Sequence, residues 1–428
     1  MKKIVLLLLP CFFSAALSAQ IEPANYNVGV TRFIKFYNEN AADSIFKMFN
    51  IKMQTALPIE KTKAVAEQLQ TQLGNIQTTE FKSINNNQAL YKTTFNNGVF
   101  ALRMSLDAEN KMSGLLVQPY QEEKVNTVDA SLSENPVTVN ATDATLSGSV
   151  LTPKNSIGKI PVVLIIAGSG PTDRDGNSGN DLTANSYFLL ANALGKAEIA
   201  SLRYDKRGVG KSNSQKSMIQ LRFDDYVNDA IAIIKQLKTD PRFSKVIVLG
   251  HSEGSLIGMI AAEKEKVDGF ISVAGAGDKA SKVITEQYKA QPKEVFLAAK
   301  AKLDSLDKGL NVVANNDPMF RPSVQPYLMS WMKYNPQTEI KKLKIPVLIV
   351  QGTHDLQVTV ADAQNLKKAK PNADLGLIDG MNHILKDAPA NREQNAATYS
   401  NPGLPLDTNF KNAVINFISK INNSILNR

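Results

Sequence analysis

The sequence predicts an α/β protein with a mostly parallel sheet, preceded by a small α+β domain. From residue 137 onward, continuous runs of valine, isoleucine and leucine alternate with helical patterns. Such runs are typical of parallel strands that are buried on both faces. Before residue 121, helical patterns come first and alternating strand patterns follow, which is the order of an α+β domain. At 428 residues the chain is long enough for two domains.

The first 19 residues are typical of a signal peptide. MKKIVLLLLPCFFSAALSAQ starts with a basic segment, continues with an apolar stretch and ends in small residues, which predicts cleavage after Ala19. Lipid attachment would use Cys11, but Pro10 in front of it fits such a site poorly. The apolar stretch is also short for a membrane anchor. We therefore expect a periplasmic or secreted protein without a membrane anchor.

Composition excludes several classes of function. Cys11 is the only cysteine, so the mature chain would lack disulfides, thiolate catalysis and zinc–cysteine sites. The net charge is +9, but the lysines and arginines are spread out and often lie beside acids, which gives nucleic-acid binding little support. We expect no metal and no organic cofactor. The sequence leaves the formation of a homo-oligomer open.

Residues 20–120 are expected to form the small α+β domain. An amphipathic pattern opens it, and Pro58 begins a second helical stretch. Strand-like runs follow, and the alternation on both sides of Asn97-Gly98 predicts a hairpin. This part of the chain has no histidine and only scattered acids. We therefore expect it to have a structural or binding role rather than a chemical one.

The sequence also predicts a linker between the two domains and a helical lid over the larger one. Residues 121–136 are polar and predict a linker to the α/β domain at 137–428, which VTVNA and ATLSGSVLTP would open as a hairpin. A long interruption with helical patterns, at about residues 276–344, separates the strand-like runs GFISVAG and IPVLIVQG. An interruption of that length between central strands usually folds over the sheet, so we expect a helical lid.

Ser252 lies between two glycines where a buried strand should become a helix. The segment KVIVLGHSEGSLIGMIAAEK has the pattern G-x-S-x-G at this junction. A nucleophile elbow has this pattern: it is a tight turn that lifts the serine hydroxyl clear of the sheet. The pentapeptide alone is weak evidence, but the strand before it and the helix after it strengthen the interpretation. Ser252 is therefore the candidate nucleophile.

A serine nucleophile needs a histidine base that a carboxylate orients. The histidines are His251, His354 and His383. His251 adjoins Ser252 and cannot swing back to its hydroxyl, so we expect it to pack under the elbow. We expect His354 to be a loop residue or to support the site from behind. His383 follows the last strand and is the candidate base.

Asp355 is the candidate acid. It follows the strand IPVLIVQG, and it gives the chain order serine, acid, histidine that this kind of site requires. Open α/β sheets bind their ligands beyond the carboxyl ends of their strands, where Asp355 would lie. Asp379 and Asp387 are rival acids, but both are close to His383 in sequence and neither ends a strand after the interruption.

The tetrahedral intermediate of acyl transfer needs backbone donors for its oxyanion. We expect one donor to be the N–H of Glu253, which follows the nucleophile. The other is expected from the loop in IIAGSGPTDRDGNS, with Ser169 as the donor and Gly168 and Gly170 allowing the loop to bend. The acids and arginine at 173–175 either serve the site or form a solvated turn, and the sequence leaves both interpretations open.

These residues resemble the α/β-hydrolase superfamily, and more closely its bacterial esterases and serine-aminopeptidase-like hydrolases. The resemblance rests on AGSGPTDRDGN, LRYDKRGVGKS, GHSEG, GTHDLQV and GMNH, in the family's order across residues 137–428. The family's first motif is usually H-G-x-G, and Ala167 replaces its histidine here, as in a known esterase branch. Residues 28–120 are similar to a cone-shaped, nuclear-transport-factor-like domain that precedes such bacterial hydrolases and brings no catalytic residues.

The resemblance implies that the turn RYDKRGVGKS, with Asp205, Arg207, Gly208 and Gly210, shapes the site without supplying a catalytic group. It also implies an α/β-hydrolase sheet with a helical lid.

The predicted activity is that of an exported serine hydrolase. Ser252 would attack an acyl carbon, His383 would act as base and then acid, and Asp355 would fix the tautomer of His383. The expected substrate is a small carboxylic ester with a short acyl group. A peptidase or amidase with the same triad is the alternative, because a triad does not specify its leaving group. A non-catalytic binding protein of this fold is less favoured, since all three residues are present in order.

Overall fold

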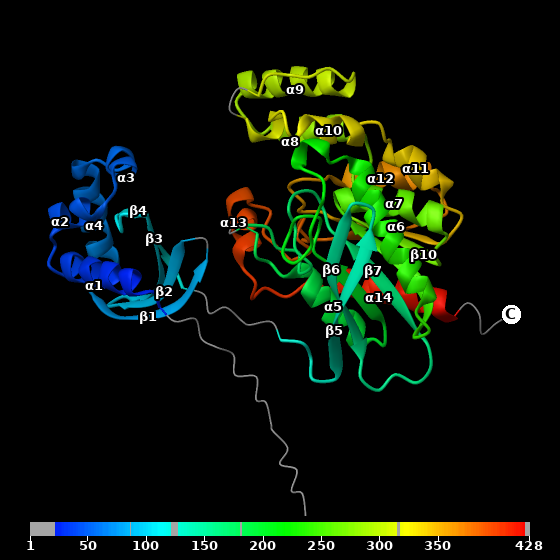
Figure 1. Ribbon diagram of the computed structural model, residues 1–428, viewed down its shortest axis with the longest axis horizontal. Coiled ribbons are helices and arrows are strands. Elements are labelled where there is room, and N and C mark those ends of the chain that lie inside the picture. Colours follow the sequence, from blue (N-terminus) through cyan, green and yellow to red (C-terminus); the bar gives the residue numbers. More distant parts are fainter. Residues whose placement is uncertain (1–21, 86, 121–126, 180–181, 315–316, 424–428) are drawn as a thin grey trace, which may run out of the picture. The chain divides into compact units, whose positions relative to one another are not determined.

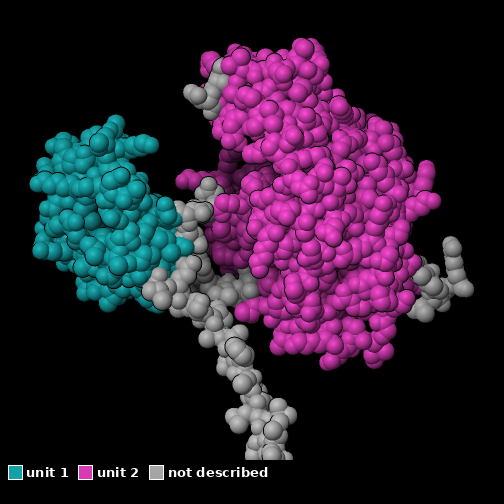
Figure 2. All heavy atoms as spheres, in the orientation of Figure 1, with its two compact units in different colours: residues 1–122 teal, residues 123–428 magenta. Residues whose placement is uncertain are grey.

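The computed structural model describes residues 22–85, 87–120, 127–179, 182–314 and 317–423. The chain divides into two units, residues 1–122 and 123–428, and each is described by itself (Figure 2). The predicted signal peptide, residues 1–19, lies outside the described residues. None of the helices within the described ranges is both long enough and apolar enough to cross a membrane.

The smaller unit has the predicted α+β architecture, with helices packed on an antiparallel sheet (Figure 1). Its helices are α1 (Ala24–Asn38), α2 (Ala42–Met48), α3 (Ile51–Ala56) and α4 (Ile59–Leu73). Its strands pair in chain order: β1 (Ile76–Asn85), β2 (Gln88–Phe95), β3 (Gly98–Leu106) and β4 (Met112–Pro119). Pro58 caps α4 as expected. The hairpin predicted at Asn97-Gly98 joins β2 to β3, with Phe95 paired to Gly98.

The larger unit is built on a mixed sheet in the order β12-β11-β10-β9-β7-β8-β6-β5. The strands are β5 (Leu132–Ala141), β6 (Ala144–Pro153), β7 (Ile160–Ile166), β8 (Ala200–Tyr204), β9 (Phe243–His251), β10 (Gly269–Val273), β11 (Val347–Gly352) and β12 (Asp374–Ile378). The strands from β12 to β8 run parallel, while β6 is antiparallel to β8 and to β5. The predicted fold class is therefore confirmed.

Helices cover both faces of this sheet (Figure 1). One layer contains α6 (Phe223–Thr239), α7 (Glu253–Glu265) and α12 (Val360–Ala369), and the other contains α5 (Ser186–Lys196) and α14 (Thr408–Asn423). Strand β7 shows why its apolar run is continuous. Val162 and Leu164 belong to the first core, and Val163 and Ile165 to the second, because successive side chains point to opposite faces.

The interruption between β10 and β11 is helical. It contains α8 (Ala280–Tyr288), α9 (Lys293–Asp307), η2 (Pro318–Phe320), α10 (Gln325–Trp331) and α11 (Pro336–Lys342). Helices α8 to α10 share an apolar core of their own and lie together at the top of the larger unit in Figure 1. The last helix differs from the expected lid at 276–344, because α11 packs against α7 and α12 and buries Ile340 in the core of the sheet.

The predicted linker at 121–136 is wrong in its second part. Residues 132–136 already belong to β5, where Leu132 pairs with Pro153 and Pro136 with Ser149. The segment looked like a linker because β5 is the edge strand, and Ser133, Glu134 and Asn135 are not buried. Edge strands tolerate polar residues and proline, since one of their sides makes no ladder hydrogen bonds.

Candidate active site

Ser252 lies alone between the end of β9 at His251 and the start of α7 at Glu253. Its backbone angles are φ 56° and ψ −122°, in a region that residues with a β-carbon rarely adopt. The Ser252 N–H donates to the carbonyl of Val273 at 2.9 Å, and the Ser252 carbonyl accepts from the N–H of Ser255 at 3.0 Å. Hydrogen bonds on both sides therefore hold the strained turn in place.

The two glycines of the G-x-S-x-G motif are required by close backbone contacts. A β-carbon at position 250 would lie 2.2 Å from the carbonyl oxygen of Gly254. One at position 254 would lie 2.4 Å from the carbonyl oxygen of Ile166, at the end of β7. Neither separation is sterically allowed, so the motif's spacing reflects how tightly α7 packs against β9 and β7.

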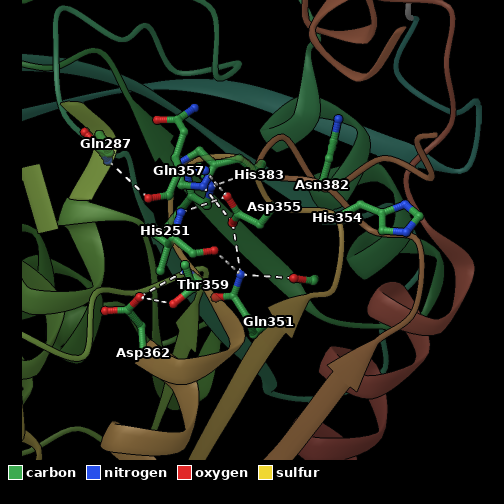
Figure 3. A network of polar contacts seen from close by, with 12 residues as sticks. His251, Gln287, Gln351, His354, Asp355, Gln357, Thr359, Asp362, Asn382 and His383 are labelled. Atoms are coloured by element: carbon green, nitrogen blue, oxygen red, sulfur yellow. Dashed lines mark hydrogen bonds and ion pairs between the residues drawn. The ribbon is translucent and has the colours of Figure 1, made fainter. Parts of the chain in front are cut away.

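His383 and Asp355 are in direct contact. Asp355 Oδ2 lies 2.8 Å from His383 Nδ1 and 3.0 Å from Gln351 Nε2, and Figure 3 shows the carboxylate between these two side chains. Asp355 Oδ1 accepts the backbone N–H groups of Gln357 and Val358 at 2.8 and 2.9 Å. Because a carboxylate only accepts hydrogen bonds, His383 carries its proton on Nδ1, and Nε2 is left free to accept one.

The side chain of Asp355 is only 1% exposed, yet its pKa lies below the ordinary value for an aspartate. Burial acts to raise its pKa, but the neighbouring His383 and the N–H donors of Val358 and Gln357 outweigh burial and hold the pKa below the ordinary value. Asp355 therefore stays ionised at neutral pH.

The candidate nucleophile and base share a pocket of about 80 Å³. Ser252, His383 and Ser169 all line it, together with apolar side chains that include Leu182 and Ile384. Asp355 does not line the pocket and contacts the Nδ1 side of His383. The folded chain thus brings together four positions that the sequence spreads over more than half of its length.

The rival acids lie outside this arrangement. Asp379 is exposed and accepts the hydroxyl of Thr353 at 3.0 Å, and Asp387 is exposed as well. His354 is also turned away from His383 (Figure 3), and its Nδ1 lies 2.6 Å from the carbonyl oxygen of Ala388.

His251 is buried beneath the elbow, where it supports the main chain of the base. Its Nε2 lies 2.8 Å from the carbonyl oxygen of His383, which can only accept, so Nε2 carries the ring proton. Its Nδ1 therefore accepts the hydroxyl of Tyr187 at 2.8 Å. Burial, reinforced by the nearby His383, lowers the pKa of His251 to about 3, so the ring is neutral at ordinary pH.

The two expected oxyanion donors lie on segments that flank the nucleophile. A β-carbon at Gly168 would come 3.1 Å from the β-carbon of Ser252, so the loop after β7 packs directly on the elbow. Ser169, the next residue, lines the pocket. Glu253 begins α7, and its buried carboxylate contacts Lys206 Nζ at 3.3 Å and the hydroxyl of Tyr327. Burial raises the pKa of Glu253, and Lys206 opposes this effect.

The charged residues at 173–175 hold the loop rather than face the pocket. Arg174 pairs with Asp205 at 2.7 Å and also donates to the hydroxyls of two serines in β6. Asp175 contacts Arg203, and Asp173 accepts backbone N–H groups of its own turn. The turn is therefore held by ion pairs, but the partners of Arg174 and Asp175 lie on β8 and just after it, and the turn is partly buried rather than solvated.

Sequence reasoning missed three residues beside the site: Lys206, Tyr187 and Gln351. Lys206 stands between Asp205 and Arg207 in a segment that reads as a charged surface turn. Gln351 did carry a signal, since it is a polar residue in the apolar strand IPVLIVQG. The part of the chain that the structure describes contains no group of three or more metal-ligating side chains.

Two family models and a curated relative match the chain. Residues 178–386 match the family described as serine aminopeptidase, S33, and residues 30–115 match a family of proteins of unknown function, DUF3887. The chain is 25% identical over 375 residues to the esterase EstD of Thermotoga maritima, covering 82% of this chain and 86% of the relative.

Two solved structures are also similar to part of the chain. Est1E from Butyrivibrio proteoclasticus with ferulic acid bound matches with a TM-score of 0.46 and 18% identity, over 68% of this chain and 100% of its own. A hypothetical protein from Pseudomonas aeruginosa matches with a TM-score of 0.48 and 16% identity, over 72% of this chain and 99% of its own.

The sheet and the elbow give the larger unit the α/β-hydrolase fold, and part of this unit matches a family of serine hydrolases. The family match and the curated relative support a hydrolase of the esterase type, and residues 30–115 match a domain family at the place where the sequence predicts an accessory domain.

Proposed function

We propose that the protein is an exported serine hydrolase that cleaves small carboxylic esters by way of an acyl-enzyme. The observation that carries the proposal is the arrangement of Ser252, His383 and Asp355. The first two residues line the same pocket, and the buried carboxylate of the third holds Nδ1 of His383. This is the arrangement that activates a serine hydroxyl.

The three residues of the triad divide the chemical steps between them. His383 Nε2 takes the proton from Ser252 Oγ as that oxygen attacks the acyl carbon, and Asp355 stabilises the imidazolium that forms. As the acyl oxygen becomes negative, it accepts hydrogen bonds from the backbone N–H groups of Ser169 and Glu253. When the tetrahedral intermediate collapses, His383 returns the proton to the leaving alcohol. Water then hydrolyses the acyl-enzyme by the same steps.

The pocket favours a small ester with a short acyl group. Its volume of about 80 Å³ is well below the roughly 300 Å³ at which sites for drug-sized ligands begin. Among the described residues that line it, none is acidic. An aminopeptidase would need a carboxylate in the lining of the pocket to bind the free amino group of its substrate, so this lining favours an ester.

A peptidase or amidase with the same triad is the second candidate, because the matched family is described as a serine aminopeptidase. A pair of chromogenic substrates separates the two. We expect the kcat/KM for nitrophenyl acetate to exceed that for an aminoacyl nitroanilide with a free amine, and we expect longer acyl chains to lower it. A higher kcat/KM for the nitroanilide would contradict the ester proposal.

Export and a periplasmic or secreted location are part of the proposal. They rest on the first 19 residues, with their basic start, apolar stretch and small-residue end. Fractionation of cells that express the whole chain, followed by N-terminal sequencing, should find the protein outside the cytoplasm and beginning at residue 20. A full-length cytoplasmic product would contradict this part.

A further inference from the structure

Lys206 is a buried cation beside the pocket, and the mechanism above does not use it. It lies in the turn after β8 and is only 3% exposed. Its Nζ lies 2.8 Å from the carbonyl oxygen of Gly168 and 3.3 Å from Oε2 of Glu253. The ring of Tyr226 lies 4.5 Å from the same nitrogen and gives the ammonium a cation–π contact. A charge buried this deeply is costly unless it is well paired.

The contact with Gly168 determines where the Ser169 N–H points. The carbonyl of Gly168 and the N–H of Ser169 belong to one peptide group, which is planar. No described peptide bond is cis, so the two groups lie in that plane and point in opposite directions. An ammonium fixed on the carbonyl oxygen therefore directs the N–H of Ser169 away from Lys206.

The peptide benefits from such a restraint because glycine restricts the backbone less than any other residue. Glycines stand on both sides of Ser169, and Gly170 has a φ of 88°. The N–H of Gly168 is held separately, at 3.3 Å from the hydroxyl of Tyr187. The preceding peptide is thus fixed from one side by Tyr187, and the following one by Lys206. The ammonium also draws charge toward the carbonyl oxygen, which makes the Ser169 N–H a stronger donor.

The same ammonium reaches the second donor segment. Glu253, at the start of α7, supplies the other N–H. Its carboxylate forms an ion pair with Lys206 and accepts a hydrogen bond from the hydroxyl of Tyr327 on α10. The ammonium of Lys206 therefore connects the loop after β7 to α7. The other oxygen of the Glu253 carboxylate connects α7 to α10, in the helical segment between β10 and β11.

We propose that Lys206 is a positioning residue of the oxyanion hole, which holds the peptide between Gly168 and Ser169 with its N–H toward the acyl oxygen. The inference rests on the proposed function, because it assumes that Ser169 and Glu253 are the oxyanion donors. Lys206 itself touches neither substrate nor the reacting atoms. Its effect should therefore appear in kcat rather than in KM, since the oxyanion exists only after the attack.

Lys206→Met tests the proposal because methionine is of similar length and has no charge. Loss of a whole oxyanion donor costs about 10²- to 10³-fold in kcat, and a donor that is only misdirected should cost less. We expect kcat for nitrophenyl acetate to fall about 10- to 100-fold, with KM within about threefold of the wild type. The inhibition constant of a trifluoromethyl ketone, which forms an oxyanion on the serine, should rise by the same factor as kcat falls.

The control must show that the variant is folded. Saturating labelling with a fluorophosphonate counts competent sites, and circular dichroism compares the fold. If Lys206→Met does not fold because it leaves the carboxylate of Glu253 unpaired, Lys206→Met with Glu253→Gln removes both charges. That double variant is compared with Glu253→Gln alone, and the same fall in kcat is expected.

A folded variant without Lys206 that keeps kcat and the ketone affinity within threefold of its reference would overturn the inference. The proposed function would survive that result. If instead the wild type neither turns over the ester nor reacts with the fluorophosphonate, the proposed function itself fails.

Discussion

Nε2 of His251 donates to the main-chain carbonyl oxygen of His383 across 2.8 Å, so the residue before the nucleophile holds the backbone of the base. His251 is also linked, through Tyr187, to the loop after β7. The hydroxyl of Tyr187 donates to Nδ1 of His251 and accepts the N–H of Gly168. One neutral imidazole and one phenol thus connect the elbow, the loop of His383 and the loop after β7.

Tyr187→Phe should remove both hydrogen bonds of the hydroxyl while the aromatic ring keeps its packing. The substitution leaves Nδ1 of His251 and the N–H of Gly168 buried without a partner, which costs about 1–3 kcal/mol of stability for each group. We expect a lower free energy of unfolding in urea and a fall in kcat of severalfold.

Tyr334→Phe is the matched control for this prediction. It removes a hydroxyl that contacts Asp224 away from the pocket, so it should lower stability with little effect on kcat. If the two variants had equal kcat, the hydroxyl of Tyr187 would have no effect on the site.

The lowered pKa of His251 predicts a stability that depends on pH. Because its pKa is about 3 in the folded chain, against 6.5 when unperturbed, the unfolded chain takes up a proton below pH 6.5 that the folded chain refuses. The stability due to the neutral ring is therefore complete above pH 6.5 and is lost as the pH falls toward 3, at about 1.4 kcal/mol per pH unit.

His251→Gln isolates that contribution, because glutamine keeps an N–H donor and does not titrate. Urea unfolding can be followed by the fluorescence of Trp331, the only tryptophan of the chain, between pH 6 and 4. The slope of stability against pH should be smaller in the variant by about 1.4 kcal/mol per unit. Parallel slopes would mean that His251 is not held neutral.

Asp355→Asn should be far more damaging than the same change at the other acids. An amide can donate to Nδ1 of His383 and so favour the wrong tautomer, at a cost on the order of 10⁴-fold in kcat. Asp379→Asn and Asp387→Asn alter exposed side chains and should change kcat less than threefold. Either of them proving worse than Asp355→Asn would show that the acid has been misassigned.

The parts of this fold that the sequence predicted are those that follow from local geometry. Apolar runs predicted the buried strands, because a strand covered on both faces has no polar side. The spacing of Gly250 and Gly254 around Ser252 predicted the elbow, because only glycine permits those backbone contacts. Chain order and position after strands were enough to single out Asp355 and His383, which the structure places 2.8 Å apart.

What the sequence did not predict depends on partners that are distant in the chain. Lys206 looks like a surface lysine until β7 and α7 bring Gly168 and Glu253 to its ammonium. Tyr187 reads as one more apolar residue of α5, since the partner of its hydroxyl lies 64 residues away. The start of β5 was missed because an edge strand has no apolar run to reveal it.

Covalent labelling can show whether Ser252 is the nucleophile. A fluorophosphonate should react with the wild type, and peptide mass spectrometry should place the adduct on Ser252. Ser252→Ala should keep the circular dichroism spectrum, lose all labelling and lower kcat by roughly 10⁶-fold. Labelling of the alanine variant at another residue, with turnover retained, would show that Ser252 is not the nucleophile.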